Sequence, residues 1–489
     1  MFYNTVCVAM VTAFAIFISI SGYHNNGSNL YGSSFWLEET PSDDVIETAL
    51  WNFDWYDFDW SEMLISVSPS GNYMLMADRG EIDINRRLMY GANALGWQTQ
   101  HLSLYERQGG SYVLIARIYI DPETDPELND TVASSDETGV AWNGDETLIL
   151  ISGGTVRTRG HFNFGASNIY LVDFSQQSVE RLTDNTFMGR EHGHVKVTLP
   201  QWSEEHGATF IRSEWADDGI NVSLMNINVE TGRQEILADL SCSEGAAFVL
   251  DYAIHGGYVY YSNSHLRIES AGLFRANLDG GQSRPIQLLS ILDIIDYYDI
   301  GFSGAGFNEF FSVEISQDGR WICLTARNMR FLTRDIPLAD CPDFPHPDPS
   351  SAVSFMTGME WIPFHTVFLY DLKNNELISP FADKLLRPDV VIVTAATFSP
   401  DGKTLLCAVF GSGGEWTMDS FNEVTLYQIR LDDGSFDTMR IFRTDLDFHT
   451  PDQLLWLGNN TLSMRPLGGT PPSFHVQIVK PAVFERFNR

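Results

Sequence analysis

Residues 399–410, SPDGKTLLCAVF, and a partial repeat at residues 316–326, SQDGRWICLTA, decide the fold. In both stretches a turn built on Asp-Gly precedes a short apolar run, a pattern typical of two antiparallel strands joined by a tight hairpin. Such a hairpin forms the first half of a β-propeller blade. The repeat therefore predicts an all-β chain of four-stranded antiparallel blades.

The turn recurs seven times, centred on Gly71, Gly144, Gly207, Gly257, Gly319, Gly402 and Gly458. The spacing averages roughly 65 residues, longer than the ~40 to 50 of compact blades. Each turn lies between two short apolar strands, and a third strand of alternating pattern follows. In six units a hairpin turn and a more polar fourth strand complete the blade. The pattern predicts seven blades, with six or eight left open if the unit around Gly257 is irregular.

The last unit, from residue 452, has only three strands, so closing the ring needs a strand from elsewhere. Residues 44–51 (DVIETALW) and 482–487 (AVFERF) are the two candidates. We expect residues 63–489 to form a single propeller domain, preceded by an N-terminal extension at residues 23–62.

Residues 397–406 (TFSPDGKTLL) and 168–173 (NIYLVD) resemble the repeats of the TolB-like, WD-like propeller family. The resemblance covers roughly residues 64–480 and implies a propeller module without naming its ligand. TolB itself carries an additional α/β domain before its propeller, which we do not expect here. Propellers of the prolyl-oligopeptidase type accompany a hydrolase domain with a Gly-x-Ser-x-Gly motif, and this sequence contains no such pentapeptide.

The chain is strongly acidic. Its 489 residues include 30 Lys and Arg against 64 Asp and Glu, a formal net charge of −34. Such a charge opposes binding to nucleic acid and to anionic lipid surfaces. We expect a monomer with no nucleic-acid partner, and the apolar fraction of 44% is ample for the cores between blades.

Residues 5–21 form an uninterrupted apolar stretch that resembles an export signal. No Lys or Arg precedes it, which leaves open an uncleaved anchor and membrane contact through this segment alone. We expect a secreted, periplasmic or cell-surface protein, with residues 1–22 as the signal or anchor.

Four cysteines follow this segment: Cys242, Cys323, Cys341 and Cys407. No Cys-x-x-Cys motif is present, so neither a zinc ribbon nor a redox motif is supported. Cys323 and Cys407 are predicted at equivalent places in the second strands of consecutive blades. We expect both to be small buried hydrophobic residues, because equivalent strands are usually too far apart for a disulfide.

The long connections all join second to third strands or one blade to the next, which places them on one face of a propeller. Long loops on a rigid scaffold commonly hold recognition sites. Arginine and aromatic residues gather in them, a combination suited to carboxylate, phosphate or peptide recognition. The alternative is that these arginines pair internally with the surplus acids. The candidate partner-binding residues are Arg86, Arg87, Trp97, Arg157, Arg159, His161, Arg190, Arg330, Arg334 and Trp416.

The sequence assigns no catalytic residue, no metal site and no cofactor. His161 with His192 and His194 is the strongest metal candidate, and solvated histidines explain it better. The leading hypothesis is a non-enzymatic propeller that binds a protein or peptide partner through its long-loop face. The alternative is a hydrolase or lyase acting on saccharide or peptide at the channel mouth, with acids drawn from different blades. A structural module of an envelope assembly would differ from the first only in its partner.

Overall fold

The structure is a computed structural model, and its described residues fall into ranges separated by gaps. These ranges are 62–78, 101–108, 111–120, 139–154, 157–158, 163–164, 167–185, 195–203, 205–216, 219–241, 247–265, 270–291, 293, 309–331, 362–378, 380, 392–410, 423–432, 436–443, 451–457, 461–466 and 474–477. Every element assigned in them is a strand. No helix in the described ranges is long and apolar enough to cross a membrane.

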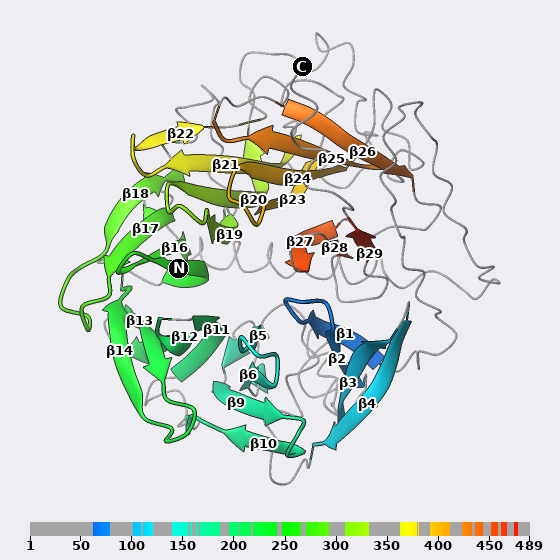
Figure 1. The fold of residues 1–489 in the computed structure, drawn as a ribbon. Coiled ribbons are helices and arrows are strands. Elements are labelled where there is room, and N and C mark those ends of the chain that lie inside the picture. Colours follow the sequence, from blue (N-terminus) through cyan, green and yellow to red (C-terminus); the bar gives the residue numbers. More distant parts are fainter. Residues whose placement is uncertain are drawn as a thin grey trace. The chain divides into compact units, whose positions relative to one another are not determined.

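The chain divides into two compact units. Of the described residues, the first unit holds those from 62 to 216 and from 225 to 234, and the second holds those from 219 to 224 and from 235 to 477. Each unit is built from antiparallel sheets in which strands follow one another in sequence order (Figure 1). The predicted all-β fold of four-stranded blades is therefore confirmed, and the chain has a β-propeller fold.

Three four-stranded sheets come first in the sequence. Their strands are β1 (Glu62–Val67), β2 (Tyr73–Asp78), β3 (His101–Gln108) and β4 (Ser111–Tyr119); β5 (Val140–Trp142), β6 (Leu148–Gly154), β9 (Ser167–Asp173) and β10 (Ser178–Arg181); and β11 (Val195–Ser203), β12 (Gly207–Ala216), β13 (Gly219–Ile227) and β14 (Gln234–Asp239). The two-residue strands β7 (Arg157–Thr158) and β8 (Asn163–Phe164) pair with each other between β6 and β9.

Three further four-stranded sheets and one three-stranded sheet follow. Their strands are β15 (Ala247–His255), β16 (Tyr258–His265), β17 (Gly272–Asn277) and β18 (Ile286–Ser290); β19 (Glu309–Ile315), β20 (Trp321–Phe331), β21 (Ile362–Asp371) and β22 (Glu376–Ile378); β23 (Ile392–Phe398), β24 (Thr404–Phe410), β25 (Glu423–Arg430) and β26 (Phe436–Arg443); and β27 (Pro451–Leu457), β28 (Thr461–Pro466) and β29 (Phe474–Gln477). Both proposed closing segments lie outside the described residues, so blade number and closure stay predictions.

The two repeats that predicted the fold form the same turn. Ser316 Oγ donates to Asp318 Oδ1 at 2.6 Å, and Ser399 Oγ donates to Asp401 Oδ1 at 2.6 Å. The glycine after each aspartate has a positive φ, 68° at Gly319 and 67° at Gly402. A side chain is strained in that conformation, which explains why glycine occupies it.

The second hairpin differs from this pattern. Gly144 has no positive φ; instead Glu146 adopts the left-handed conformation, at 56°. Its carboxylate accepts hydrogen bonds from Ser70 N and Ser70 Oγ, each at 2.5 Å, which ties this turn to the preceding sheet. The hairpin lies where the sequence predicted it, and its left-handed residue is Glu146, two positions after the glycine on which the turn was centred.

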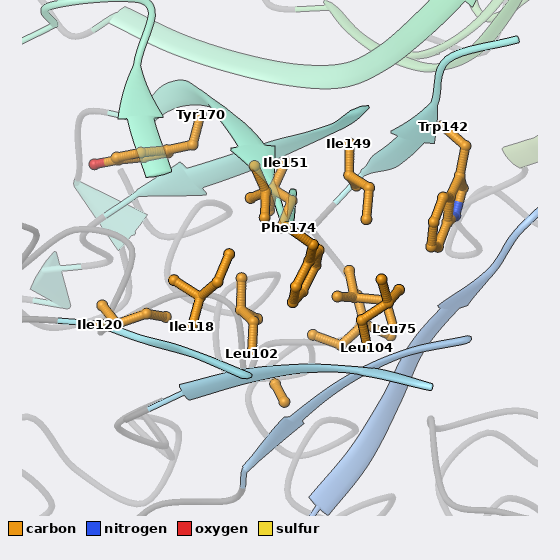
Figure 2. Close-up of a cluster of buried hydrophobic side chains, with 13 residues drawn as sticks. Leu75, Leu102, Leu104, Ile118, Ile120, Trp142, Ile149, Ile151, Tyr170 and Phe174 are labelled. Atoms are coloured by element: carbon orange, nitrogen blue, oxygen red, sulfur yellow. The ribbon is translucent and has the colours of Figure 1, made fainter. Parts of the chain in front are cut away.

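Apolar side chains from facing sheets form the cores. Figure 2 shows the core between the sheet of β1 to β4 and the sheet of β5, β6, β9 and β10. Leu75 and Leu102 from one sheet and Ile151 and Val172 from the other are each 0% exposed. Side chains alternate between the two faces of a strand, so a sheet that packs between two others buries both of its faces.

Cys323 and Cys407 do not occupy equivalent places, contrary to expectation. Cys323 is the third residue of β20 and Cys407 is the fourth residue of β24, both counted from the same turn. Neighbouring positions along a strand point to opposite faces, so the two thiols project into one shared core from sheets on either side. Both cysteines are free and buried, as predicted, and burial raises the pKa of each thiol.

Strand β4 lies at the edge of its sheet and contains a bulge. Leu104 pairs with Ala116 and Tyr105 pairs with Leu114, which leaves Ile115 as an extra residue without a partner in β3. The bulge interrupts the alternation of side chains. The three consecutive residues Val113, Leu114 and Ile115 are all exposed, at 42%, 39% and 45%.

Candidate acid–base site on the inner strands

The structure describes two of the ten predicted partner-binding residues. Arg157 lies on β7 in the first unit, and Arg330 lies on β20 in the second. The other eight, Arg86, Arg87, Trp97, Arg159, His161, Arg190, Arg334 and Trp416, lie outside the described residues. A shared binding surface for these residues stays a prediction.

Several arginines outside that set pair with acids. Arg320 Nη2 lies 2.7 Å from Asp371 Oδ2, and Arg430 Nη2 lies 2.6 Å from Asp432 Oδ2. The Arg320 bond holds the pKa of Asp371 below its usual range. Whether the predicted loop arginines also pair internally stays a prediction.

Asp251 and Glu314 form a different kind of acidic site. They belong to β15 and β19, the first strands of two consecutive sheets of the second unit. A register shift between Val249 and Asp251 marks a bulge directly before Asp251. Bulges re-aim the side chains beside them and are frequent next to active sites.

Asp251 connects β15 to β19. Its Oδ2 accepts a hydrogen bond from the Val313 backbone N–H at 2.8 Å, and its Oδ1 accepts from the Tyr252 N–H at 2.9 Å. Val313 directly precedes Glu314 in β19. The first bond therefore brings the Asp251 carboxyl beside the strand position that holds the second acid.

Glu314 connects β19 to β23 in the same manner. Its Oε1 accepts a hydrogen bond from the Phe398 backbone N–H at 3.0 Å and another from Thr397 Oγ1 at 3.0 Å. Both donors belong to β23. Among the described contacts of Glu314, none engages Oε2, so one oxygen is held and the other is left available.

Both carboxyl groups have raised pKa values. The pKa of Asp251 is raised from 3.8 to about 7, and that of Glu314 is raised from 4.5 to about 7. Burial is the largest cause of both shifts, although each residue keeps part of its surface exposed. The hydrogen bonds from Val313 and Tyr252 act in the opposite direction on Asp251, and those from Phe398 and Thr397 do so on Glu314. The charge of Asp251 adds a smaller upward contribution to Glu314. A carboxyl with a pKa near neutral can both give and take a proton.

Sequence reasoning missed these two acids. Both lie in the short apolar strands expected before the turns at Gly257 and Gly319, and those strands were treated as purely structural. A signal was present, because Asp251 and Glu314 each lie between two apolar residues of a strand, and Tyr252 and Val313 are 1% and 5% exposed. An ionisable residue in such a strand is costly to bury and invites a functional explanation.

The described residues contain no group of three His, Cys, Asp or Glu side chains arranged to hold a metal ion. The free thiols Cys323 and Cys407 are buried, and their raised pKa values keep them protonated and unreactive. Asp251 and Glu314 are therefore the groups of the described second unit best suited to proton transfer.

The chain matches no known protein family and no curated protein by sequence. Its fold is similar to that of solved propeller structures. An oligogalacturonate lyase in complex with manganese has 9% identity and a TM-score of 0.45, covering 87% of this chain and 92% of that one. A periplasmic gluconolactonase of Pseudomonas aeruginosa has 13% identity and a TM-score of 0.40, covering 86% and 88%. One of two prolyl endopeptidases has 8% identity and a TM-score of 0.43, covering 84% of this chain and 48% of that one.

These similar structures contradict the leading hypothesis from the sequence. That hypothesis was a non-enzymatic module that binds a protein or peptide partner, whereas the lyase, the gluconolactonase and the endopeptidase are enzymes. We therefore withdraw that hypothesis. At 8% to 13% identity the likeness shows the fold alone, so an activity has to be argued from the residues of this chain.

Proposed function

We propose that this protein is an exported acid–base enzyme, a hydrolase or lyase acting on saccharide or peptide, with Asp251 and Glu314 as its proton-transferring groups. We further propose that its propeller is built from TolB-like repeats. The observation behind the enzymatic proposal is the pair of part-buried carboxyl groups on consecutive first strands, with Glu314 Oε2 free of described partners.

The geometry suits two reaction classes that use a pair of carboxyl groups. In hydrolysis one carboxyl protonates the leaving oxygen or nitrogen, while the other, as carboxylate, takes a proton from the attacking water. In elimination the carboxylate takes a proton from carbon, a carbon–carbon double bond forms, and the carbon–oxygen bond to the leaving group breaks. The protonated carboxyl then supplies the proton of the leaving oxygen.

Near neutral pH each group is close to half protonated, which supports the assignment of one acid and one base. Because both pKa values are about 7, a fraction of molecules holds one proton on the pair at any moment. The rate is expected to depend on pH around neutrality, where the singly protonated pair is most populated.

The arginine and aromatic residues of the long connections are proposed as the substrate-binding part of the enzyme. Arginine recognises carboxylate groups through two parallel hydrogen bonds, so acidic saccharides and peptides with acidic or free carboxyl ends are the favoured substrates. Arg157 and Arg330 are the two members of this set on described strands. The apolar segment at residues 5–21 supports an exported location.

The test is a turnover screen of the full chain against acidic and neutral polysaccharides and against peptides. Ultraviolet absorbance of an unsaturated product detects elimination, and isotope incorporation from labelled water detects hydrolysis. For an active substrate, Glu314→Gln and Asp251→Asn are each expected to lower kcat by about 10² to 10⁴ fold. Glu376→Gln, an exposed glutamate on β22 of the same sheet as Glu314, is the matched control and should leave kcat unchanged.

Turnover that survives both Glu314→Gln and Asp251→Asn would place the chemistry elsewhere in the chain. Absence of turnover with every substrate would reject the enzymatic proposal for these substrate classes. Circular dichroism and thermal unfolding of each variant must match the parent chain before a loss of kcat is attributed to the missing proton donor or acceptor.

A further inference from the structure

Glu314 is held asymmetrically. The Phe398 N–H and the Thr397 hydroxyl both donate to Oε1, each at 3.0 Å. A proton on Oε1 would oppose one or both of these donors, since an oxygen that bears hydrogen is a poorer acceptor. When Glu314 is protonated, the proton therefore belongs on Oε2.

We propose that Thr397 is a positioning residue, which fixes Oε1 of Glu314 as the anchored oxygen and leaves Oε2 as the oxygen that exchanges protons. The inference rests on the proposed function, because it concerns the same carboxyl group. It adds Thr397, a residue of the next sheet, to the site, and it identifies Oε2 as the oxygen of Glu314 that gives and takes the proton.

The backbone bond alone does not explain the presence of a hydroxyl. The Phe398 N–H would anchor Oε1 with any residue at position 397. Thr397 occupies the same position in its strand as Glu314 does, since Thr397 lies two residues before the turn serine Ser399 and Glu314 lies two residues before Ser316. Thr397 is 6% exposed, so its hydroxyl needs a partner within the protein. Glu314 supplies the acceptor, and the pair fixes two side chains that project from neighbouring sheets.

Among the side chains described around Glu314, Thr397 is the one that favours the charged form of the Glu314 carboxyl. Asp251 approaches from β15, and its charge raises the pKa of Glu314. Cys323 lies opposite Glu314 in the register of β19 and β20, and Cys407 faces Cys323 from β24. Both thiols are protonated, and none of the described contacts of Glu314 is with a cation. The bonds from Thr397 and Phe398 are thus the described contacts that oppose burial.

The test measures the protonation of Glu314 directly. The full chain is labelled with carbon-13 at glutamate carboxyl groups and titrated by NMR, and the Glu314 signal is identified by its loss in Glu314→Gln. Thr397→Val removes the hydroxyl at similar volume and is expected to raise the midpoint by about one pH unit, as loss of a hydrogen bond to a charged group implies. Thr397→Ser keeps the donor and should leave the midpoint within a few tenths of a unit. Thr404→Val, on β24 of the same sheet, is the control and should change nothing.

A midpoint that moves in Thr397→Val and returns in Thr397→Ser supports the proposal. An unchanged midpoint in Thr397→Val overturns it. Where turnover is found, the pH profile of kcat should move upward with the NMR midpoint in Thr397→Val. An NMR shift in a chain that turns over no substrate would support the anchoring of Oε1 and reject the proposed function, so the two failures are distinguishable.

Discussion

Within each unit, hydrogen bonds connect the first strand of one sheet to the first strand of the next, and the two units use different acceptor groups for these bonds. In the first unit the Trp142 indole Nε1–H donates to Ser66 Oγ at 3.0 Å, and the Trp202 Nε1–H donates to the Ala141 carbonyl at 3.1 Å. In the second unit backbone N–H groups donate to the carboxylates of Asp251 and Glu314.

The comparison can be made at one structural position. Ser66, Ala141 and Glu314 each lie two residues before the residue that closes the hairpin with its N–H, namely Ser68, Asn143 and Ser316. A hydroxyl or a backbone carbonyl is sufficient there in the first unit. Because neutral acceptors perform the same connection, the carboxylate of Glu314 is not required by the architecture and provides a proton-binding group in addition.

The largest effect on stability is expected in the first unit, where the donor is a large buried side chain. Trp142→Ala should lower the free energy of unfolding by about 3 to 5 kcal/mol, because it removes the indole from the core as well as its hydrogen bond. Trp142 is 8% exposed and packs with the residues of Figure 2. Urea unfolding gives the value. A loss below about 1 kcal/mol would show that this connection contributes little.

The carboxyl groups of Asp251 and Glu314 should make the free energy of unfolding depend on pH. A folded-state pKa above the unfolded value means that the folded state binds more protons between the two values. Stability therefore falls as pH rises from about 4 to about 7. Outside that range the contribution of these two groups to stability does not change with pH. The double variant Asp251→Asn, Glu314→Gln should gain a few kcal/mol relative to the parent chain across this interval. Unfolding by urea at pH 4, 5.5 and 7.5 measures it, and a gain that is equal at all three values would contradict the raised pKa values.

The smallest effect is expected for Ser66→Ala. It leaves the Trp142 Nε1–H without its acceptor in a part-buried setting and should cost about 1 to 2 kcal/mol, independent of pH between 4 and 8. Trp142→Phe removes donor and bond together and provides the matched comparison. If Ser66→Ala were pH dependent, the contrast between neutral and titratable connections would fail.

The sequence predicted the strands well because their signals are local. Asp-Gly turns at Asp318 and Asp401 and apolar runs after them form hairpins through contacts within a few residues, and the structure confirms these hairpins. The misplaced detail is the equivalence of Cys323 and Cys407. Cys323 follows Gly319 by four residues whereas Cys407 follows Gly402 by five, a difference that the sequence shows and the prediction overlooked.

The acid–base site could not be located from local pattern, because its geometry comes from contacts between sheets. Val313 is 62 residues from Asp251, and Phe398 is 84 residues from Glu314. An acid between apolar neighbours was visible in each strand, but the hydrogen bonds that select one of its oxygens were not. The composition of the expected loops directed attention to Arg157 and Arg330 instead, although the structure places these two arginines on strands β7 and β20.

The bulge in β4 affects how the molecule behaves at high concentration. Three adjacent apolar side chains on an edge strand would ordinarily invite a second chain to extend the sheet. With Ile115 displaced from the ladder, an incoming strand cannot match β4 along its length. Colloidal solubility at this edge thus depends on backbone irregularity, because the segment from Ser111 to Tyr119 holds no acidic residue although the whole chain has a net charge of −34. Deleting Ile115 would straighten the edge and favour filaments.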